Sequence, residues 1–462
     1  MSIYYPQASV KLNVRWENFG QKNEVLDKES IVDIHCKNVI VEMNDYSEAD
    51  TVKLSIDHSS FPFDPRCIRA CGITVFMENV KKESKEGTDR QKIIPSEQNT
   101  VFIGFADESS IKFDTDSNTV SIEGRDYTSL FIDQKRPDRS PISLSKPIDL
   151  IIQDLINEQE ATKRIKIVNR TGEDLPTLSK IAPDFNESTN VKNPKRKETY
   201  WDIMQEILNR VALLGFIELD KFVITKPQNI YEKKDIKQFV WGKNVKDIEF
   251  KRKLGRSKDF NVKVISFNQI EKRVEVALIP EEAIDANIKA PRVTVPQFDK
   301  DGKKVEPPKD ADFVTFNVKD ITSKEQLIKI GESIYSEMSR QQIEGSLTTF
   351  EMEVPEERFK SSDEINYVPV KFNAIRNGTA IRIFFSTQEA IHLNQKSNRS
   401  EKKAFLLKRG YPENVANAFA ESLDRINTAF YTRSVSFELD QDNGFSMKID
   451  FINFIDLDSS LQ

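Results

Sequence analysis

The chain has 462 residues and a formal net charge of −6 at neutral pH. Its hydrophobic share of 38%, together with many charges of both signs, excludes a disordered chain, which lacks the apolar residues needed for a core. The acidic balance argues against a dedicated nucleic-acid binder, because neutralising phosphates requires an excess of basic residues.

The length predicts about three domains, since a single hydrophobic core stops growing beyond roughly 250–300 residues. No run approaches the roughly 18 apolar residues that span a bilayer, so no integral membrane segment is expected. The first residues lack a basic region followed by an apolar core. We therefore expect no secretory signal and predict assembly in a cytoplasm.

Residues 1–130 are predicted to form a first β-domain. Residues with high strand propensity, often alternating with polar ones, fill six segments: 10–16, 31–43, 51–56, 72–77, 101–106 and 119–124. Residues 81–100 are charged and poor in apolar side chains, which predicts a loop between two of these strands.

Residues 131–235 are predicted to form an α/β domain. Five apolar residues with the spacing i, i+3, i+4, i+7, i+8 give its first helix one apolar face: Ile148, Ile151, Ile152, Leu155 and Ile156. Thr199 is placed to cap a second helix with Asp202, and Gly215 is placed to end it. A hairpin that turns at Asp220-Lys221 is predicted to follow.

Residues 236–345 are predicted to form a second β-domain with a trailing helix. Its strand-like segments are 239–250, 260–268, 274–279 and 313–320. A Pro- and Lys-rich stretch at 280–311 predicts a long loop. Thr322 and Glu325 have the spacing of a capping box, in front of a helix that runs to about Gln342.

Residues 346–462 are predicted to form a C-terminal β-domain with a helical insertion at about 387–429. The domain ends in a predicted hairpin with an Asn443-Gly444 dipeptide, which favours a type I′ turn. Apolar residues on the two arms of this hairpin are expected to face one another: Val435, Phe437 and Leu439 on one arm, and Phe445, Met447, Ile449 and Phe451 on the other.

The three cysteines, Cys36, Cys67 and Cys71, are too few for a disulfide scaffold. Cys67 and Cys71, with His35 and His58 upstream, are one possible zinc site. Structural zinc sites favour a second compact ligand pair, which this sequence does not contain. Small buried thiols are therefore the favoured interpretation, and we expect no metal and no cofactor.

The first and third predicted domains contain an apparent repeat in the same order, offset by about 200 residues each time. KNV at 37–39 matches KNV at 243–245, VKLSI at 52–56 matches VKVIS at 262–266, and VSIEGRDYTS at 120–129 matches VTFNVKDITS at 314–323. The repeat predicts a duplicated β-barrel in which the last strand of each copy turns into a helix.

Aspartate and threonine at the end of each copy are predicted to cap the helix that follows, because their oxygens accept bonds from unpaired N–H groups. The alternative is an anion site, formed by those N–H groups and Arg125. The predicted turn and cap positions are Gly124, Arg125, Asp126, Thr128, Lys319, Asp320, Thr322 and Glu325. The motif occurs twice with different flanking residues, which favours helix capping over an anion site.

The order of these features resembles the central hub proteins of phage contractile-tail baseplates, the family that includes the Mu hub and the late control protein D group. The motifs that carry this resemblance are VSIEGRDYTSLFID, KPIDLIIQDLI, ETYWDIMQEILNRVALLGFIELDKFVIT, GESIYSEMSRQQIEGSLTTFEM and NGTAIRI. They extend over most of the chain. The sequence departs from the family in its long charged loops and in the insertion at 387–429.

The resemblance implies two similar small β-barrels, an intervening α/β domain and a C-terminal β-domain. It further implies a homotrimeric symmetry adapter, in which three chains with two barrels each present six similar edges. The implied partners are the six-fold tail tube, a separate trimeric spike and other baseplate proteins, with DNA passing through as cargo. The implied location is the virion, after assembly in the bacterial host cytoplasm.

Three other functions stay open. A tail-associated cell-wall hydrolase is one, although the three histidines, His35, His58 and His392, lie in no catalytic motif. A combined hub and spike of a type VI-like secretion system is another, and it requires further domains after the hub. The third is a receptor-binding module that uses aromatic clusters, which are more often core residues. Because the hub role implied by the resemblance works through interfaces, we expect no catalytic residues.

Overall fold

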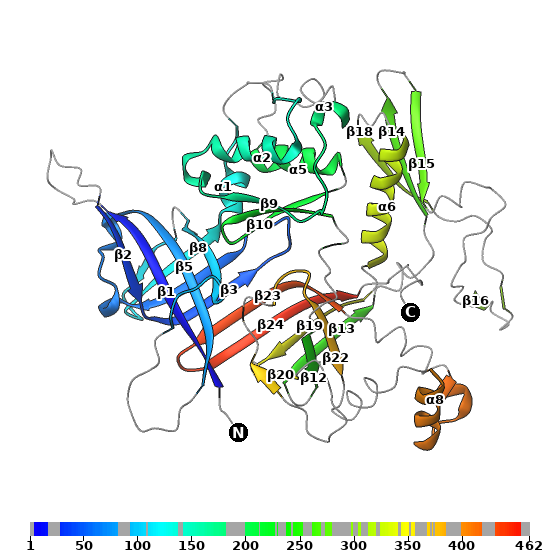
Figure 1. Ribbon diagram of the computed structural model, residues 1–462. Helices are drawn as coiled ribbons and strands as arrows, with labels where there is room; N and C mark the ends of the chain where they lie inside the picture. The colour runs from blue at the N-terminus through cyan, green and yellow to red at the C-terminus, as the bar shows by residue number, and fades with distance from the viewer. Residues whose placement is uncertain are drawn as a thin grey trace.

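Alternating apolar and polar residues give the chain a mainly β fold in the computed structural model (Figure 1). The structure describes residues 4–16, 28–81, 93–107, 110–136, 142–181, 199–211, 213–226, 229, 237–241, 244–252, 261–268, 273–279, 297–298, 304–305, 313–319, 324–340, 343–350, 353–355, 367–369, 372, 375–384, 399–417 and 430–453. The predicted class, mainly β with α+β segments, is confirmed.

Most strands belong to one long sheet. An N-terminal strand group contains β1 (Tyr4–Trp16), β2 (Lys28–Ile34), β3 (Cys36–Met43), β4 (Thr51–Asp57), β5 (Ile68–Lys81), β6 (Thr100–Ala106), β7 (Lys112–Asp114) and β8 (Thr119–Asp126). A C-terminal strand group contains β12 (Lys237–Val240), β13 (Asp247–Arg252), β19 (Ile343–Thr349), β22 (Ala380–Phe384), β23 (Phe430–Asp440) and β24 (Gly444–Asn453). The main order is β13-β19-β24-β23-β3-β4-β8-β6-β5-β1-β2.

The two strand groups are joined where β3 and β23 pair antiparallel, from Val435↔Met43 to Asp440↔Asn38. Figure 1 shows the red C-terminal hairpin beside the blue strand β3. Val41 and Phe437 belong to one buried cluster that continues across this joint. The two ends of the chain therefore share one hydrophobic core.

The C-terminal hairpin has the predicted facing pairs, among them Phe437↔Met447 and Leu439↔Phe445. Its turn differs from the prediction. Asp440 pairs with Gly444 across three residues, and Gly444 has a φ of 80°. The Asp440 carboxylate accepts bonds from the N–H groups of Asp442 and Asn443, which stabilises this longer loop over the two-residue type I′ turn.

A first α/β unit lies between the strand groups in the chain. It contains α1 (Thr128–Asp133), α2 (Ile148–Asn157), β9 (Lys166–Asn169), α3 (Leu178–Ile181), α5 (Tyr200–Asn209), β10 (Leu214–Glu218) and β11 (Lys221–Thr225). The predicted apolar face of α2 is confirmed, because all five of its residues are buried. The capping box is confirmed too, with the Thr199 hydroxyl accepting from the N–H of Asp202 at 3.1 Å.

Gly215 does not end this helix, contrary to the prediction. Helix α5 ends at Asn209, and Gly215 lies in β10, where a Cβ atom would lie 2.3 Å from the Leu208 side chain. The glycine therefore allows strand and helix to pack closely. The hairpin turns at Leu219 and Asp220, one residue earlier than predicted, with Leu219 at a φ of 59°.

A second α/β unit contains β14 (Asn261–Asn268), β15 (Arg273–Ile279), β18 (Phe313–Lys319) and α6 (Lys324–Arg340). Leu327 of α6 is buried against Val262, Val264 and Ile279. In both α/β units a three-stranded sheet combines one antiparallel hairpin with one parallel neighbour.

The strand equivalence predicted from the repeat is wrong. Strands β4 and β8 are antiparallel neighbours in the long sheet, whereas β14 and β18 are parallel neighbours in a separate sheet. Apolar alternation occurs in any half-buried strand, so it matched strands of different topology. The long sheet also interleaves strands from the predicted third and fourth domains. The domain boundaries themselves stay a prediction.

The remaining described elements are small. They are the 3-10 turns η1 (His58–Ser60), η2 (Pro65–Cys67) and η3 (Glu160–Thr162), the strand pairs β16 (Gln297–Phe298) with β17 (Lys304–Val305) and β20 (Glu353–Pro355) with β21 (Tyr367–Pro369), and helix α8 (Arg399–Lys408). Helix α8 lies in the predicted insertion. None of the helices in the described part of the chain is long and apolar enough to cross a membrane.

Two of the three cysteines have thiols that the fold keeps protonated at neutral pH. Burial raises the pKa of the Cys36 thiol and of the Cys71 thiol to about 12 each. The His35 ring contacts Gln441, and the His58 ring packs against the Phe113 ring at a tilt of 43°. Within the described ranges, no group of three or more metal-ligating side chains occurs.

We expect Cys67 to react with a maleimide at pH 8 well before the other two thiols. Cys36 and Cys71 will react only after unfolding in urea, because a thiol with a pKa near 12 is about 0.01% thiolate at that pH. Mass spectrometry of tryptic peptides measures the order of labelling. Equal rates at all three sites in the folded protein would contradict this prediction.

Candidate functional site

The Gly-Arg-Asp sequence at 124–126 ends β8 and leads into α1. A Cβ atom on Gly124 would lie 2.5 Å from the carbonyl oxygen of Phe105, so the glycine lets β6 approach closely. The buried Asp126 carboxylate accepts bonds from the N–H and the hydroxyl of Thr128, each at 3.0 Å. These contacts tie the last residue of the strand to the first residue of the helix. The N-cap of α1 is Tyr127, which makes no side-chain cap bond, so neither Asp126 nor Thr128 occupies the predicted cap position.

Arg125 forms two ion pairs within the chain. Its Nε lies 2.8 Å from a carboxylate oxygen of Asp107, and its Nη2 lies 2.6 Å from one of Asp133. The guanidinium is therefore already neutralised, and this geometry does not favour the anion-site alternative. Because the side chain of Arg125 is one-third exposed, at 33%, each pair contributes only about 0.2–1 kcal/mol.

The second set of predicted positions is described only in part. Lys319 is the last residue of β18, and Glu325 is exposed in the first turn of α6. Asp320 and Thr322 lie outside the described residues. Their proposed capping role stays a prediction.

A continuous polar face lies on the long sheet, across β13, β19, β24, β23, β3, β4 and β8. We call it the polar sheet face. Strand register places these outward residues on it: Asp247, Glu249, Lys251, Glu344, Ser346, Thr348, Ser446, Lys448, Asp450, Ser434, Ser436, Glu438, Asp440, Asn38, Ile40, Glu42, Thr51, Lys53, Ser55, Ser121, Glu123 and Arg125. The alternate residues of β24, β23, β3, β4 and β8 are mostly buried.

The polar sheet face is acidic and rich in hydroxyl groups. Eight of its residues are acidic, four are basic and eight are serine or threonine, so its formal charge is −4. Several of its donors are already used internally. Thr51 donates to Glu42 at 2.8 Å, and Asn38 donates to Asp440 at 2.9 Å. The net negative charge of such a surface repels phosphate groups.

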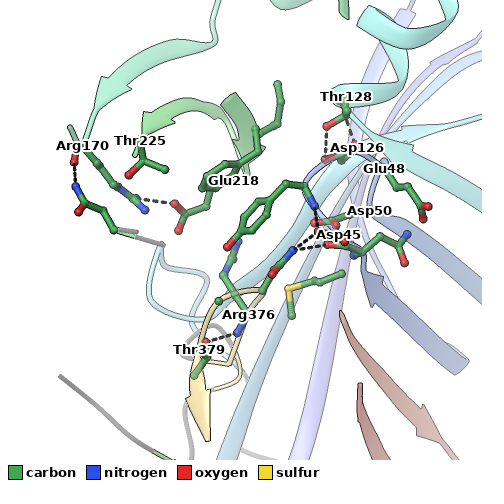
Figure 2. Close-up of a pocket in the computed structure, with 18 of the residues that line it drawn as sticks. Asp45, Glu48, Asp50, Asp126, Thr128, Arg170, Glu218, Thr225, Arg376 and Thr379 are labelled. Carbon is green, nitrogen blue, oxygen red and sulfur yellow. Dashed lines mark hydrogen bonds and ion pairs between the residues drawn. The ribbon is translucent and has the colours of Figure 1, made fainter. Parts of the chain in front are cut away.

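A cavity of about 570 Å³ lies where the two strand groups meet the first α/β unit. Its walls come from the β3–β4 loop at 44–50, the end of β8, strand β10 and the turn at 376–380. Figure 2 shows Asp50 and Asp126 close together on one side, with Arg376 and the Arg170–Glu218 ion pair opposite. We call this region the junction cavity.

Two carboxyl groups of the junction cavity have strongly shifted acidity. Asp50 keeps some surface open to the cavity, yet protein atoms surround it densely, and this desolvation raises its pKa to about 7. Burial also raises the pKa of Asp126, and the nearby Asp50 charge raises it further. This arrangement of Asp50, Asp126 and Arg376 was not predicted from the sequence, because nothing local links the Asp50 loop to Arg376 more than three hundred residues later.

No protein-family model matches this sequence, and no curated protein matches it significantly. Among solved structures, a tail protein from Neisseria meningitidis MC58 aligns at 11% identity and a TM-score of 0.52, covering 96% of both chains. The prophage MuSo2 43 kDa tail protein from Shewanella oneidensis aligns at 12% identity and a TM-score of 0.51, covering 97% of this chain and 98% of the other. The chain therefore has the fold of known phage tail proteins.

Proposed function

We propose that this chain is the structural hub of a phage tail baseplate, or of a related contractile injection machine, and that it acts as a homotrimer. The observation that carries the proposal is the long sheet, in which two strand groups of one chain are joined edge to edge. The first group lies within the predicted first barrel, whereas the second combines strands of the predicted second barrel with strands of the predicted C-terminal domain. The fold shared with two phage tail proteins supports the same assignment.

The edge-to-edge joint makes a symmetry adapter physically reasonable. In this proposal the two strand groups of each of three chains occupy six positions around one ring, which suits a six-fold tail tube, while the trimer itself suits a three-fold spike. At one end of the sheet order, β13 has β19 as its neighbour within the described residues. An open strand edge is a template for pairing with another chain, so we place a contact between copies at β13.

The polar sheet face then forms the wall of the passage through the ring. DNA is cargo there and binds no specific site, because an acidic wall does not retain phosphates. The proposed partners are the tail tube protein, a separate trimeric spike and other baseplate proteins. The proposed location is the virion, after assembly in the host cytoplasm, with no catalytic role.

The solution mass of the purified chain tests the assembly. We expect a particle of three times 53.2 kDa, alone or after the tail tube protein of the same tail is added. A chain that stays monomeric with that partner present contradicts the hub proposal. Cleavage of purified peptidoglycan that stops when one carboxylate is substituted contradicts the non-enzymatic role.

Charge reversal on the polar sheet face tests the passage wall. We expect Glu42→Lys, Glu123→Lys and Glu438→Lys in one chain to create binding to short duplex DNA, measured by fluorescence anisotropy. The binding will weaken steeply with added salt, because counterions are released. The exposed residues Asp116, Asp174 and Glu332, changed to lysine together, provide a control of equal charge away from this face. Equal DNA binding by both variants would contradict the assignment.

A further inference from the structure

The junction cavity is the point where three parts of the chain touch. In the β3–β4 loop, the Tyr46 ring lies 4.4 Å from the ring of Phe216 in β10, measured between centroids. The neighbouring Asp45 accepts bonds from Asn377 at 3.2 Å and from Arg433 at 3.3 Å. One loop of the N-terminal strand group thus contacts both the first α/β unit and the C-terminal strand group.

Two carboxyl groups face each other at the base of this loop. The β4–β8 ladder ends with Thr51↔Arg125, so the next residues on each strand, Asp50 and Asp126, lie opposite one another. The N–H of Asp126 donates to the carbonyl oxygen of Asp50 at 3.0 Å, which fixes this pairing. Like charges directly opposite in a sheet are destabilising, more so where water is excluded.

The other charged groups around the junction cavity do not cancel two negative charges on this pair. Arg376, from the turn before β22, is the cation that favours the charged form of Asp50, and it also faces Glu218 and Arg170. Arg170 is already paired with Glu218. The remaining charged groups of the cavity lining are Asp45, Glu48 and Lys237, of which two are acidic.

We propose that the Asp50–Asp126 pair makes this joint sensitive to protonation. The joint is closed while the pair holds a proton, and it loosens when both carboxyl groups are ionised. Loosening frees the Asp50 loop from the first α/β unit and from the turn at 376–380. This inference stands on the geometry of the joint and does not depend on the hub assignment.

The direction of the pH effect follows from the raised pKa values of Asp50 and Asp126. A carboxyl whose pKa is raised in the closed state favours that state at low pH and loses this contribution as pH rises. For Asp50 the loss falls between its ordinary value of 3.8 and about 7, and for Asp126 it also falls above 3.8, because burial raises the pKa of that carboxyl well above its ordinary value. The joint is therefore tightest in mild acid.

Hydrogen–deuterium exchange on the full chain between pH 5 and pH 8 tests the proposal. After correction for intrinsic rates, the protection of amides in 44–50 and in β10 is expected to fall by about tenfold for each pH unit, up to pH 7. Peptides from α6 should show no such change. A flat profile for 44–50 in the natural protein would overturn the proposal.

Three variants separate the pair from a general effect of pH. Asp126→Asn keeps the size and an acceptor for the Thr128 bonds, and we expect it to flatten the profile. We expect Asp50→Asn to flatten the profile as well. It is the variant to measure if Asp126→Asn does not fold. Asp57→Asn is the matched control, because Asp57 lies on the same strand and its pKa is lowered by Ser59. Profiles of the natural shape in both Asp50→Asn and Asp126→Asn would refute the inference.

Discussion

Gly104→Ala is expected to lower the free energy of unfolding by about 3 kcal/mol or more, enough to remove much of the stability of the N-terminal strand group. A Cβ atom at this position would lie 2.2 Å from the carbonyl oxygen of Arg125 and 2.7 Å from the Phe102 ring. Backbone cannot move aside without separating β6 from β8. Urea unfolding followed by circular dichroism measures the change.

A glycine on the neighbouring strand provides the control. Gly72 lies in β5, and a Cβ atom there would be 3.5 Å from the nearest atom, a side-chain carbon of Asn13. That is an ordinary contact distance, so Gly72→Ala should change stability by less than about 1 kcal/mol. Equal losses in the two variants would show that strand flexibility, and not close approach, determines the effect.

Phe437→Ala is expected to destabilise the joint between the strand groups by about 3–5 kcal/mol. Phe437 is fully buried, and its ring lies 5.5 Å from Phe372 and 6.5 Å from Phe445, between centroids. It also lies on β23, which pairs with both β24 and β3. A cavity at this position therefore weakens contacts of both strand groups at once.

Phe113→Ala is the matched control, because Phe113 is 44% exposed and should cost less than about 1 kcal/mol. Phe437→Leu should recover most of the loss, since it restores apolar volume. In the hub proposal, Phe437→Ala should also reduce trimer formation at a temperature where the chain is still folded. A stability equal to that of Phe113→Ala would contradict a shared core.

The polar sheet face and the shared core are two sides of the same strands. On β23, Phe437 points into the core and its neighbour Glu438 lies on the polar sheet face. Because side chains alternate, a strand with one fully buried face presents the other face in a fixed register. Packing of the core thus holds the proposed passage wall in place.

Local features of the sequence were sufficient for several elements. The spacing of isoleucines in α2 and the Thr199–Asp202 capping box were both predicted, because a helix face and a cap each depend on residues within a few positions. The same holds for the facing pairs of the C-terminal hairpin. Gly215 was misinterpreted, because a glycine needed for close packing looks the same in sequence as one that ends a helix.

The pairing of strands far apart in the chain could not be predicted from the sequence. Alternation indicated that 37–43 and 435–440 are strands, but β3 and β23 pair through backbone groups that carry no residue-specific signal. For the same reason, the apparent repeat matched β8 with β18, although these strands belong to different sheets.

The sequence by itself therefore determined which segments are strands and helices, and which side of each is apolar, since these depend on local periodicity. Only the tertiary structure decided which edges meet, and with them the polar sheet face and the opposed Asp50 and Asp126. Those features arise from the register of strands far apart in the chain, where many pairings satisfy the same apolar pattern and packing of the whole core selects one.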